Sequence, residues 1–241
     1  MTGDTSRPKN LILRALPPED FARLQPDLGI TDLSFKRVLH RDGEPIETVY
    51  FPWSGVCSIT RTMRDGRMVE VGIVGREGAV GSLAGLGVEH ATGDCMVQIA
   101  GEGAHTLRTA IFSAEMNRRG ALFTLVTRFT QALTTLALQS VACNALHTAE
   151  ERCARWLLLS HDRADGDTFA LSHEFLSVML GVRRPTATIA AGILQRAGLI
   201  TYKRGRMTIL DRERLEDAAC ECYAAVQEKF DSLMPRAGQP G

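Results

Sequence analysis

The chain has no excess of either charge and no long apolar run. Its 28 Lys and Arg residues balance 28 Asp and Glu residues, so the formal net charge at pH 7 is zero. No chain-wide basic field therefore indicates a nucleic-acid partner, although a small basic face can be balanced by acidic residues elsewhere. No stretch approaches the roughly 18 consecutive apolar residues of a membrane span. The N-terminal segment MTGDTSRPKN also lacks the apolar core of a signal peptide. These absences predict a cytoplasmic protein with no membrane partner.

The six cysteines form no CxxC pair, and no histidines are grouped with them at the spacing of the common zinc motifs. Cys220 and Cys222 could bind a metal, but buried cysteines on a helix are the preferred interpretation. In a cytoplasmic protein the thiols are expected to be reduced. The sequence thus predicts no metal and no cofactor.

Common catalytic motifs are absent as well. We find no GxSxG, no phosphate-binding loop, no HExxH and no paired carboxylates suited to a cleft. We therefore expect a protein that is not an enzyme.

Residues from about 30 to 110 carry turn signals about every ten residues, the spacing typical of an antiparallel sandwich or barrel. These signals are RDGEP, WSG, RDGR, GREG and AGEG. The Asp65-Gly66 turn is the strongest hairpin signal among them. Strand-like runs lie between the turns, at 48–51, 56–60, 68–74 and 96–100.

A long helix is predicted next, because the segment from Phe112 to Leu146 holds no proline and a single glycine, Gly120. Residues along it recur in alternating steps of three and four, as in a coiled-coil seam. The stripe could pack on the chain's own core, but its length favours pairing of two copies of the chain. The predicted dimerisation residues are Leu122, Leu125, Phe129, Ala132, Leu136, Gln139 and Cys143.

The C-terminal third predicts a winged helix-turn-helix. After a helix at 149–160 come a short helix at 171–180 capped by Ser172, a turn at 181–183 and a second helix at 184–196. Pro185 fits the first turn of that helix, and Gly198 ends it. A minimal hairpin (199–203 and 206–210) follows, and Asp211 caps a final helix.

In this motif the N-terminal residues of the second helix face the bases of the major groove. Arg183 and Arg184 stand at the positive end of the helix dipole, a position that an external phosphate would compensate. Eight basic residues against two acidic ones lie between 183 and 214, although a solvated basic face is the alternative interpretation. The predicted DNA-binding residues are Ser172, His173, Arg183, Arg184, Thr186, Thr188, Gln195, Lys203, Arg204 and Arg206.

Together these residues resemble the Crp/Fnr superfamily of dimeric bacterial transcription regulators. The segment GEPIETVYFPWSGV (43–56) is similar to the family's cyclic-nucleotide-binding-type jelly roll, and LSHEFLSVMLGVRRPTATIAAGILQRAGLI (171–200) is similar to its helix-turn-helix. The resemblance implies an α+β fold. It comprises an N-terminal extension (1–20), an antiparallel jelly-roll sensor (21–112), a dimerisation helix (113–148) and a winged helix-turn-helix (149–241). It also implies a homodimer on a palindromic DNA site, with RNA polymerase as a further partner.

Two departures from the family pattern bear on what the protein senses and reads. No arginine stands between Arg76 and Arg108, where cyclic-AMP-binding members hold the cyclic phosphate, so we expect no binding of cyclic AMP in the usual way. On the second helix, Pro185 and Ile189 replace a Glu and an Arg of well-known members. The DNA sequence that this protein binds should therefore differ from the site of those members. The effector is unknown. Binding of a cyclic nucleotide stays open as an alternative, and so does haem binding through His40, His90 or His105. A winged helix that binds protein in place of DNA is a further alternative.

Overall fold

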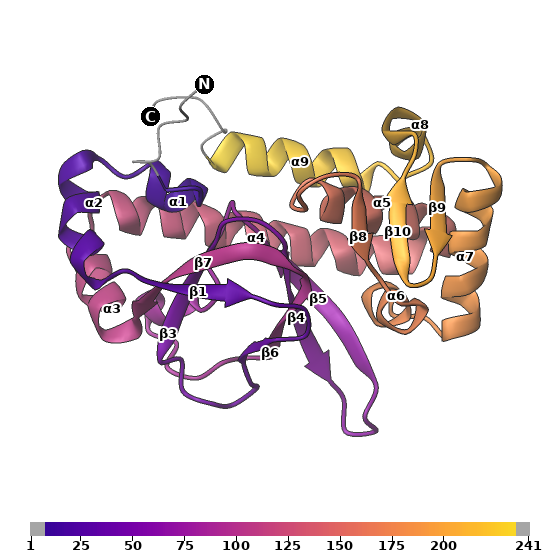
Figure 1. Ribbon diagram of the computed structural model, residues 1–241. Helices are drawn as coiled ribbons and strands as arrows, with labels where there is room; N and C mark the ends of the chain where they lie inside the picture. Colours follow the sequence, from indigo (N-terminus) through magenta and orange to yellow (C-terminus); the bar gives the residue numbers. More distant parts are fainter. Residues whose placement is uncertain (1–7, 235–241) are drawn as a thin grey trace.

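The computed structural model describes residues 8–234 of the chain. Its elements are arranged along one long helix, α4 (Ala121–Leu146), which runs the length of the molecule (Figure 1). A β-rich N-terminal part packs against one portion of this helix, and a smaller part made of helices and a short sheet lies at its other end. The predicted α+β class, with an antiparallel N-terminal part followed by a long helix and a helix-turn-helix, is confirmed.

The N-terminal part is a β-sandwich made of the strands β1 (Gly29–Leu33), β2 (Val38–His40), β3 (Thr48–Pro52), β4 (Val56–Thr62), β5 (Met68–Val74), β6 (Asp94–Ile99) and β7 (Gly101–Arg108). Within the described residues these strands form a three-stranded antiparallel sheet in the order β1-β7-β3 and a four-stranded one in the order β2-β6-β4-β5. Buried side chains of both sheets, Phe51 and Val97 among them, join one apolar core.

The strands predicted at 48–51, 56–60, 68–74 and 96–100 correspond to β3, β4, β5 and β6. The sequence does not predict β1, β2 or β7. The first two are short edge strands of five and three residues, and β7 begins inside the AGEG segment, which is typical of a turn. Gly55 has φ +82, and a Cβ there would lie 2.6 Å from the Ile99 carbonyl oxygen, so this turn needs a glycine.

Short helices flank the sandwich. They are α1 (Leu11–Arg14), α2 (Pro18–Leu24), η1 (Gln25–Asp27), η2 (Ser82–Leu86) and α3 (Thr109–Asn117). Of these, α1, α2 and α3 lie together at one end of the sandwich (Figure 1). Ile12 and Leu13 of α1 lie in the core with 0% and 1% of their surface exposed. Asn10 caps this helix and donates two hydrogen bonds, to the carbonyl oxygens of Pro52 and Gly78. The described part of the predicted extension is thus integral to the sandwich.

The helix predicted over 113–148 is two helices. α3 ends at Asn117 and α4 begins at Ala121, because Arg119 adopts φ 58 and Gly120 is extended. The reversal folds α3 back against the sandwich, where Phe112 and Met116 are buried.

The stripe predicted to pair two copies of the chain lies instead inside its own protomer. Phe129 and Ala132 have no exposed surface, and a Cβ at Gly78 would lie only 2.2 Å from the Phe129 ring. The steps of three and four fit a helix on its own core equally well, and the sandwich and the C-terminal helix fill this side of α4. The burial covers Leu122, Leu125, Phe129, Ala132, Leu136 and Cys143, with Gln139 partly buried.

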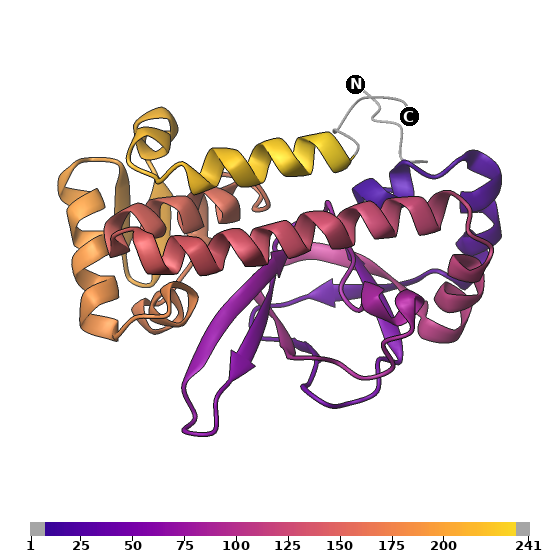
Figure 2. The same cartoon turned by 180° about the vertical axis from the view of Figure 1, so that it is seen from behind.

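A second stripe on the outer face of α4 is exposed. Leu138 and Val141 on it expose 67% and 70% of their surface. Figure 2 shows α4 lying in front of the sheets. The stripe repeats in steps of three and four: Thr127, Gln131, Thr134, Leu138, Val141 and Ala145. Of the helices described, α4 alone is long and apolar enough to cross a membrane by length and composition, and its buried and exposed apolar faces together account for that composition.

The C-terminal part contains α5 (Ala149–His161), β8 (Thr168–Ala170), α6 (His173–Leu180), α7 (Arg184–Arg196), β9 (Ile200–Lys203), β10 (Arg206–Ile209), α8 (Arg212–Asp217) and α9 (Cys222–Leu233). The predicted capping is confirmed at Ser172, whose hydroxyl accepts from the N–H of Phe175, and at Asp211, whose carboxylate accepts from the N–H of Arg214. The predicted final helix is interrupted after Asp217, and α9 then runs back along α4 (Figures 1 and 2).

Candidate nucleic-acid interface

Helix α7 is packed on one face and free on the other. Its inner face is made of small and apolar side chains, namely Ala187, Ala190, Ala191 and Leu194, and all are buried. Gly181, in the left-handed region at φ 60, ends α6 and allows the tight turn into α7. Pro185 stands in the first turn of α7, as predicted. The geometry leaves the N-terminal end of α7 open to solvent, with Arg183, Arg184 and Thr186 exposed.

The contact between α6 and α7 uses two of the predicted DNA-binding residues. Nδ1 of His173 lies 2.6 Å from the hydroxyl of Thr188, which also donates to the carbonyl oxygen of Arg184 at 3.0 Å. The His173 ring packs on Tyr202 with centroids 4.4 Å apart. Burial, and then the nearby charge of Arg184, lower the pKa of His173, and both effects favour the neutral ring. These side chains fix the angle between the two helices.

The wing is a three-stranded sheet in the order β8-β10-β9. The sequence predicts β9 and β10 but not β8, a three-residue strand that pairs with β10. Lys203, Arg204 and Arg206 lie at the hairpin tip and are exposed, and Arg204 has φ 51 in the tight turn before Gly205. Figure 1 shows this hairpin beside α7 at the edge of the molecule.

Gln195 joins the wing to α7. Its Oε1 accepts a hydrogen bond of 2.8 Å from the backbone N–H of Tyr202. Although predicted to contact DNA, this amide holds the β9 strand against the helix. Ser172 has a structural role of the same kind as the cap of α6.

The basic residues divide into two groups. Arg212 is held by Asp162, Glu216 and the Tyr223 hydroxyl, and Arg214 reaches Asp211 and the Ala197 carbonyl oxygen. In contrast, no ion pair within residues 8–234 engages the exposed cations around the α7 N-terminus and the wing tip, which are Arg183, Arg184, Lys203, Arg204 and Arg206. The described structure thus gathers five unpaired cations on the side of the molecule that α7 and its wing present.

Comparison with known proteins bears directly on this part of the chain. Residues 151–218 match the model of the Crp-like helix-turn-helix domain. The described part of the chain shares its fold with solved Crp/Fnr-family regulators. It is similar to a CRP-family transcriptional regulator from Thermus thermophilus, with a TM-score of 0.65 and 21% identity over 78% of this chain and 96% of the other. No curated protein matches the chain in sequence.

Two further solved structures share the Crp/Fnr fold. One is a putative Crp/Fnr-family regulator from Eubacterium rectale, with a TM-score of 0.64 and 16% identity over 84% of this chain and 94% of the other. The other is the c-di-GMP-responsive global regulator CLP of Xanthomonas campestris, with a TM-score of 0.62 and 16% identity over 80% of this chain and 99% of the other. The resemblance inferred from the sequence is therefore confirmed at the level of fold and helix-turn-helix domain.

Protein side chains pack closely against the glycines at η2 in the sandwich. A Cβ at Gly81 would lie 2.6 Å from the His40 ring, and one at Gly85 would lie 2.6 Å from Met116. Nε2 of His40 lies 2.8 Å from the Thr48 carbonyl oxygen, and Nδ1 of His105 accepts a hydrogen bond from the Trp53 indole at 2.7 Å. His90 is exposed. The two half-buried candidate sensor histidines, His40 and His105, are thus engaged with neighbouring groups.

The sandwich contacts the winged helix through a polar group beneath α5. Glu70 on β5 accepts hydrogen bonds from the Ser58 hydroxyl and from the Trp156 indole, at 2.5 and 2.8 Å. Burial raises the pKa of Glu70 to about 7, while these donors and the charges of Arg155 and Arg163 favour its ionised form. Glu70, Arg155 and Trp156 line a pocket between β5, α4, α5 and α6. Sequence patterns do not identify Glu70, because its neighbours come from distant segments.

Proposed function

We propose that this protein is a sequence-specific DNA-binding transcription regulator that acts as a homodimer on a palindromic site. The observation that supports it most directly is the exposed, unpaired N-terminal end of α7, with Arg183, Arg184 and Thr186, on a Crp-like helix-turn-helix domain. In such domains the N-terminal residues of this helix contact base edges, and neighbouring cations bind phosphate.

The wing extends the same interface. Lys203, Arg204 and Arg206 at its tip are suited to phosphates that flank the groove, because they are exposed and carry no ion pair among the described residues. Thr188, His173, Ser172 and Gln195 are committed to internal hydrogen bonds and hold α7 and the wing in position. We assign direct contact to the arginines and Thr186.

The dimer would form through the outer stripe of α4. Its apolar residues Leu138 and Val141 are the large exposed hydrophobics at the middle of the seam. Two parallel copies of this stripe give the repeat that coiled-coil pairing needs. The α7 helices of the two subunits would then contact half-sites about 34 Å apart, which is one helical turn of DNA.

We further propose that the sandwich does not bind cyclic AMP in the usual way. A cyclic phosphate needs a cationic partner in a buried site, and the segment from Glu77 to Leu107 carries no arginine or lysine. Calorimetry with cyclic AMP and cyclic GMP tests this point, since micromolar affinity for either would contradict it. As a regulator the protein would act in the cytoplasm and contact RNA polymerase.

In vitro selection from random duplex DNA with the full chain tests the proposed function. We expect enrichment of an inverted repeat whose half-sites are about one helical turn apart. Alanine at Arg184 and Thr186 should abolish the enrichment. If no inverted repeat emerges at moderate salt, or if these two substitutions leave DNA binding unchanged, the proposal fails, and the latter result would point to a winged helix that binds protein.

A further inference from the structure

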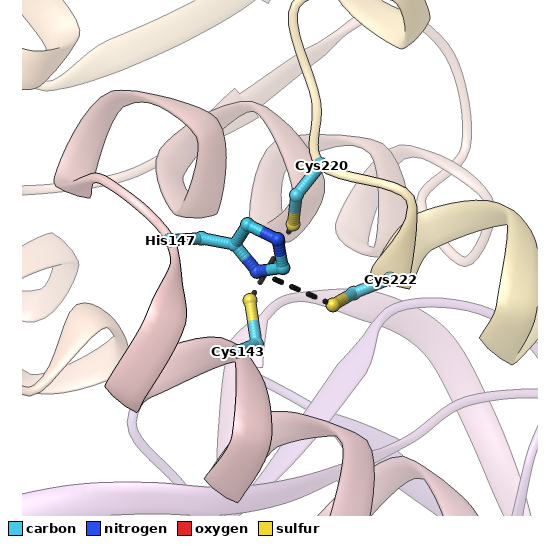
Figure 3. A group of neighbouring side chains, drawn as sticks. All are labelled: Cys143, His147, Cys220 and Cys222. Carbon is cyan, nitrogen blue, oxygen red and sulfur yellow. Dashed lines mark hydrogen bonds between the residues drawn. The ribbon is translucent and has the colours of Figure 1, made fainter.

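Four side chains with metal-binding chemistry converge where α4 meets α9. Cys143 and His147 lie one helical turn apart at the C-terminal end of α4, where the His147 N–H donates to the Cys143 carbonyl oxygen. Cys220 precedes α9, and Cys222 is its first residue. Figure 3 shows the three sulfur atoms and the imidazole ring turned toward one another. Both cysteines lie in the segment where α8 ends and α9 begins, and the packing of α9 along α4 places them at the end of α4.

The distances suit a single ion. The Sγ atoms of Cys143 and Cys220 are 3.4 Å apart, and Nδ1 of His147 is 3.5 Å from Sγ of Cys222. All four ligand atoms lie within 4.8 Å of one another. A tetrahedral zinc ion with Zn–S bonds of about 2.3 Å places its ligands about 3.8 Å apart. An iron–sulfur cluster stands between its cysteines and holds them farther apart, so it does not fit this spacing.

The histidine is already oriented as a ligand. Nε2 of His147 lies 3.1 Å from a carboxylate oxygen of Glu221, so this nitrogen carries the proton and Nδ1 presents its lone pair to the sulfurs. A carboxylate on the outer nitrogen is the usual support of a zinc-bound histidine. Nε2 of Gln139 also donates to Sγ of Cys222 at 3.0 Å. The contact of Glu221 with His147 and that of Gln139 with Cys222 are both compatible with an imidazole and a thiolate that bind a metal ion.

Burial and charge suit the same ion. The three cysteines expose between 0% and 5% of their surface, and the His147 side chain exposes 16%. Three thiolates around a divalent cation carry one net negative charge. The buried guanidinium groups of Arg152 and Arg155 act electrostatically on Cys143. Their Nε atoms have no hydrogen-bond partner among the described residues.

We propose that Cys143, His147, Cys220 and Cys222 bind one Zn²⁺ ion, which fastens the C-terminal helix α9 to the end of α4. Three soft thiolates and one imidazole in a closed tetrahedral set select zinc over harder divalent ions. The four ligands leave no open position for substrate, so the site is structural. The inference does not depend on DNA binding, because it concerns the contact between two helices behind the winged helix.

Metal analysis of the full chain, purified under reducing conditions without chelator, tests the site. We expect one zinc per chain, and after replacement by Co²⁺ the absorption bands of tetrahedral cobalt with thiolate-to-cobalt charge transfer. Titration against a chromophoric chelator then gives the affinity. Cys220→Ser and Cys222→Ser should lose the metal, whereas Cys153→Ser, at a buried cysteine outside the cluster, should retain it.

A milder variant avoids any dependence on folding of the cysteine mutants. Glu221 is an exposed residue, with 79% of its side chain accessible, so Glu221→Gln should fold normally. Loss of the carboxylate that supports His147 should weaken zinc binding by about 10- to 100-fold. The proposal is overturned if the reduced protein binds no zinc or cobalt, if it yields only a Cys143–Cys220 disulfide, or if Cys153→Ser loses metal as readily as Cys222→Ser.

Discussion

The indole Nε1 of Trp156 donates a 2.8 Å hydrogen bond to the carboxylate of Glu70, and this bond joins strand β5 of the sandwich to helix α5 of the winged helix. On the other side of the carboxylate, the Ser58 hydroxyl donates as well. Met179 of α6 lies against the same serine, with its sulfur 3.7 Å from the hydroxyl oxygen. The protonation state of Glu70 therefore affects the hydrogen bonds that join the sandwich to the winged helix.

Because Glu70 lies in this contact between the sandwich and the winged helix, the free energy of unfolding should fall as the pH rises. Burial raises the pKa of Glu70 to about 7 from an ordinary value of 4.5, so between these values the folded chain holds a proton that the unfolded chain has lost. The free energy of unfolding then decreases from about pH 4.5 to about pH 7, by on the order of 2 kcal/mol. In Glu70→Gln this decrease should vanish. Urea unfolding of both proteins across this range measures it, and parallel pH profiles would contradict the prediction.

The cations of α7 should carry the salt dependence of DNA binding. We expect Arg184→Ala to weaken binding to the selected operator about tenfold and to lower the slope of log K against log salt by about 1 per subunit. Arg108→Ala provides the control, because this exposed arginine precedes α3 at the far end of the molecule. Fluorescence anisotropy at several salt concentrations measures both quantities, and equal losses for the two variants would speak against the assignment.

The outer stripe of α4 should determine the oligomeric state. Val141→Asp places a charge in the middle of the proposed seam, where burial of an unpaired carboxylate is costly, so we expect a monomer. Met63→Asp introduces the same charge at an exposed apolar residue outside α4, which is 58% exposed, and should leave the dimer intact. Sedimentation velocity distinguishes the species. A Val141→Asp protein with the mass of a dimer would exclude this seam.

The ion pair between Arg163 and Glu77 should contribute more to the free energy of unfolding than any ion pair on the surface. Its two atoms are 2.7 Å apart, and the side chains expose only 5% and 12%. Glu77→Ala leaves the guanidinium buried without its partner, so we expect a loss of about 3–5 kcal/mol in the free energy of unfolding. Glu102→Ala removes the exposed pair with Lys9 and should cost at most about 1 kcal/mol. Chemical denaturation compares them, and losses of similar size would show that burial does not set the difference.

Local sequence determined the elements that do not depend on distant neighbours. The Ser172 and Asp211 caps, the Gly181 turn and Pro185 at the start of α7 were all predictable, because each needs a residue type at a fixed place in the chain. The same holds for the β4–β5 hairpin, whose Asp65-Gly66 turn is a short-range signal.

Only the tertiary structure decided which faces and which distant residues meet. Steps of three and four along α4 fit two stripes, and the packing of the sandwich buried the one with Phe129 and left the one with Leu138 exposed. Gln195 and Glu70 acquired their roles from partners that the chain order does not reveal. Cys143 and Cys222 are far apart in sequence, and the packing of α9 along α4 brings them together. Periodicity shows that a helix has a buried side, but only the three-dimensional packing determines which side that is.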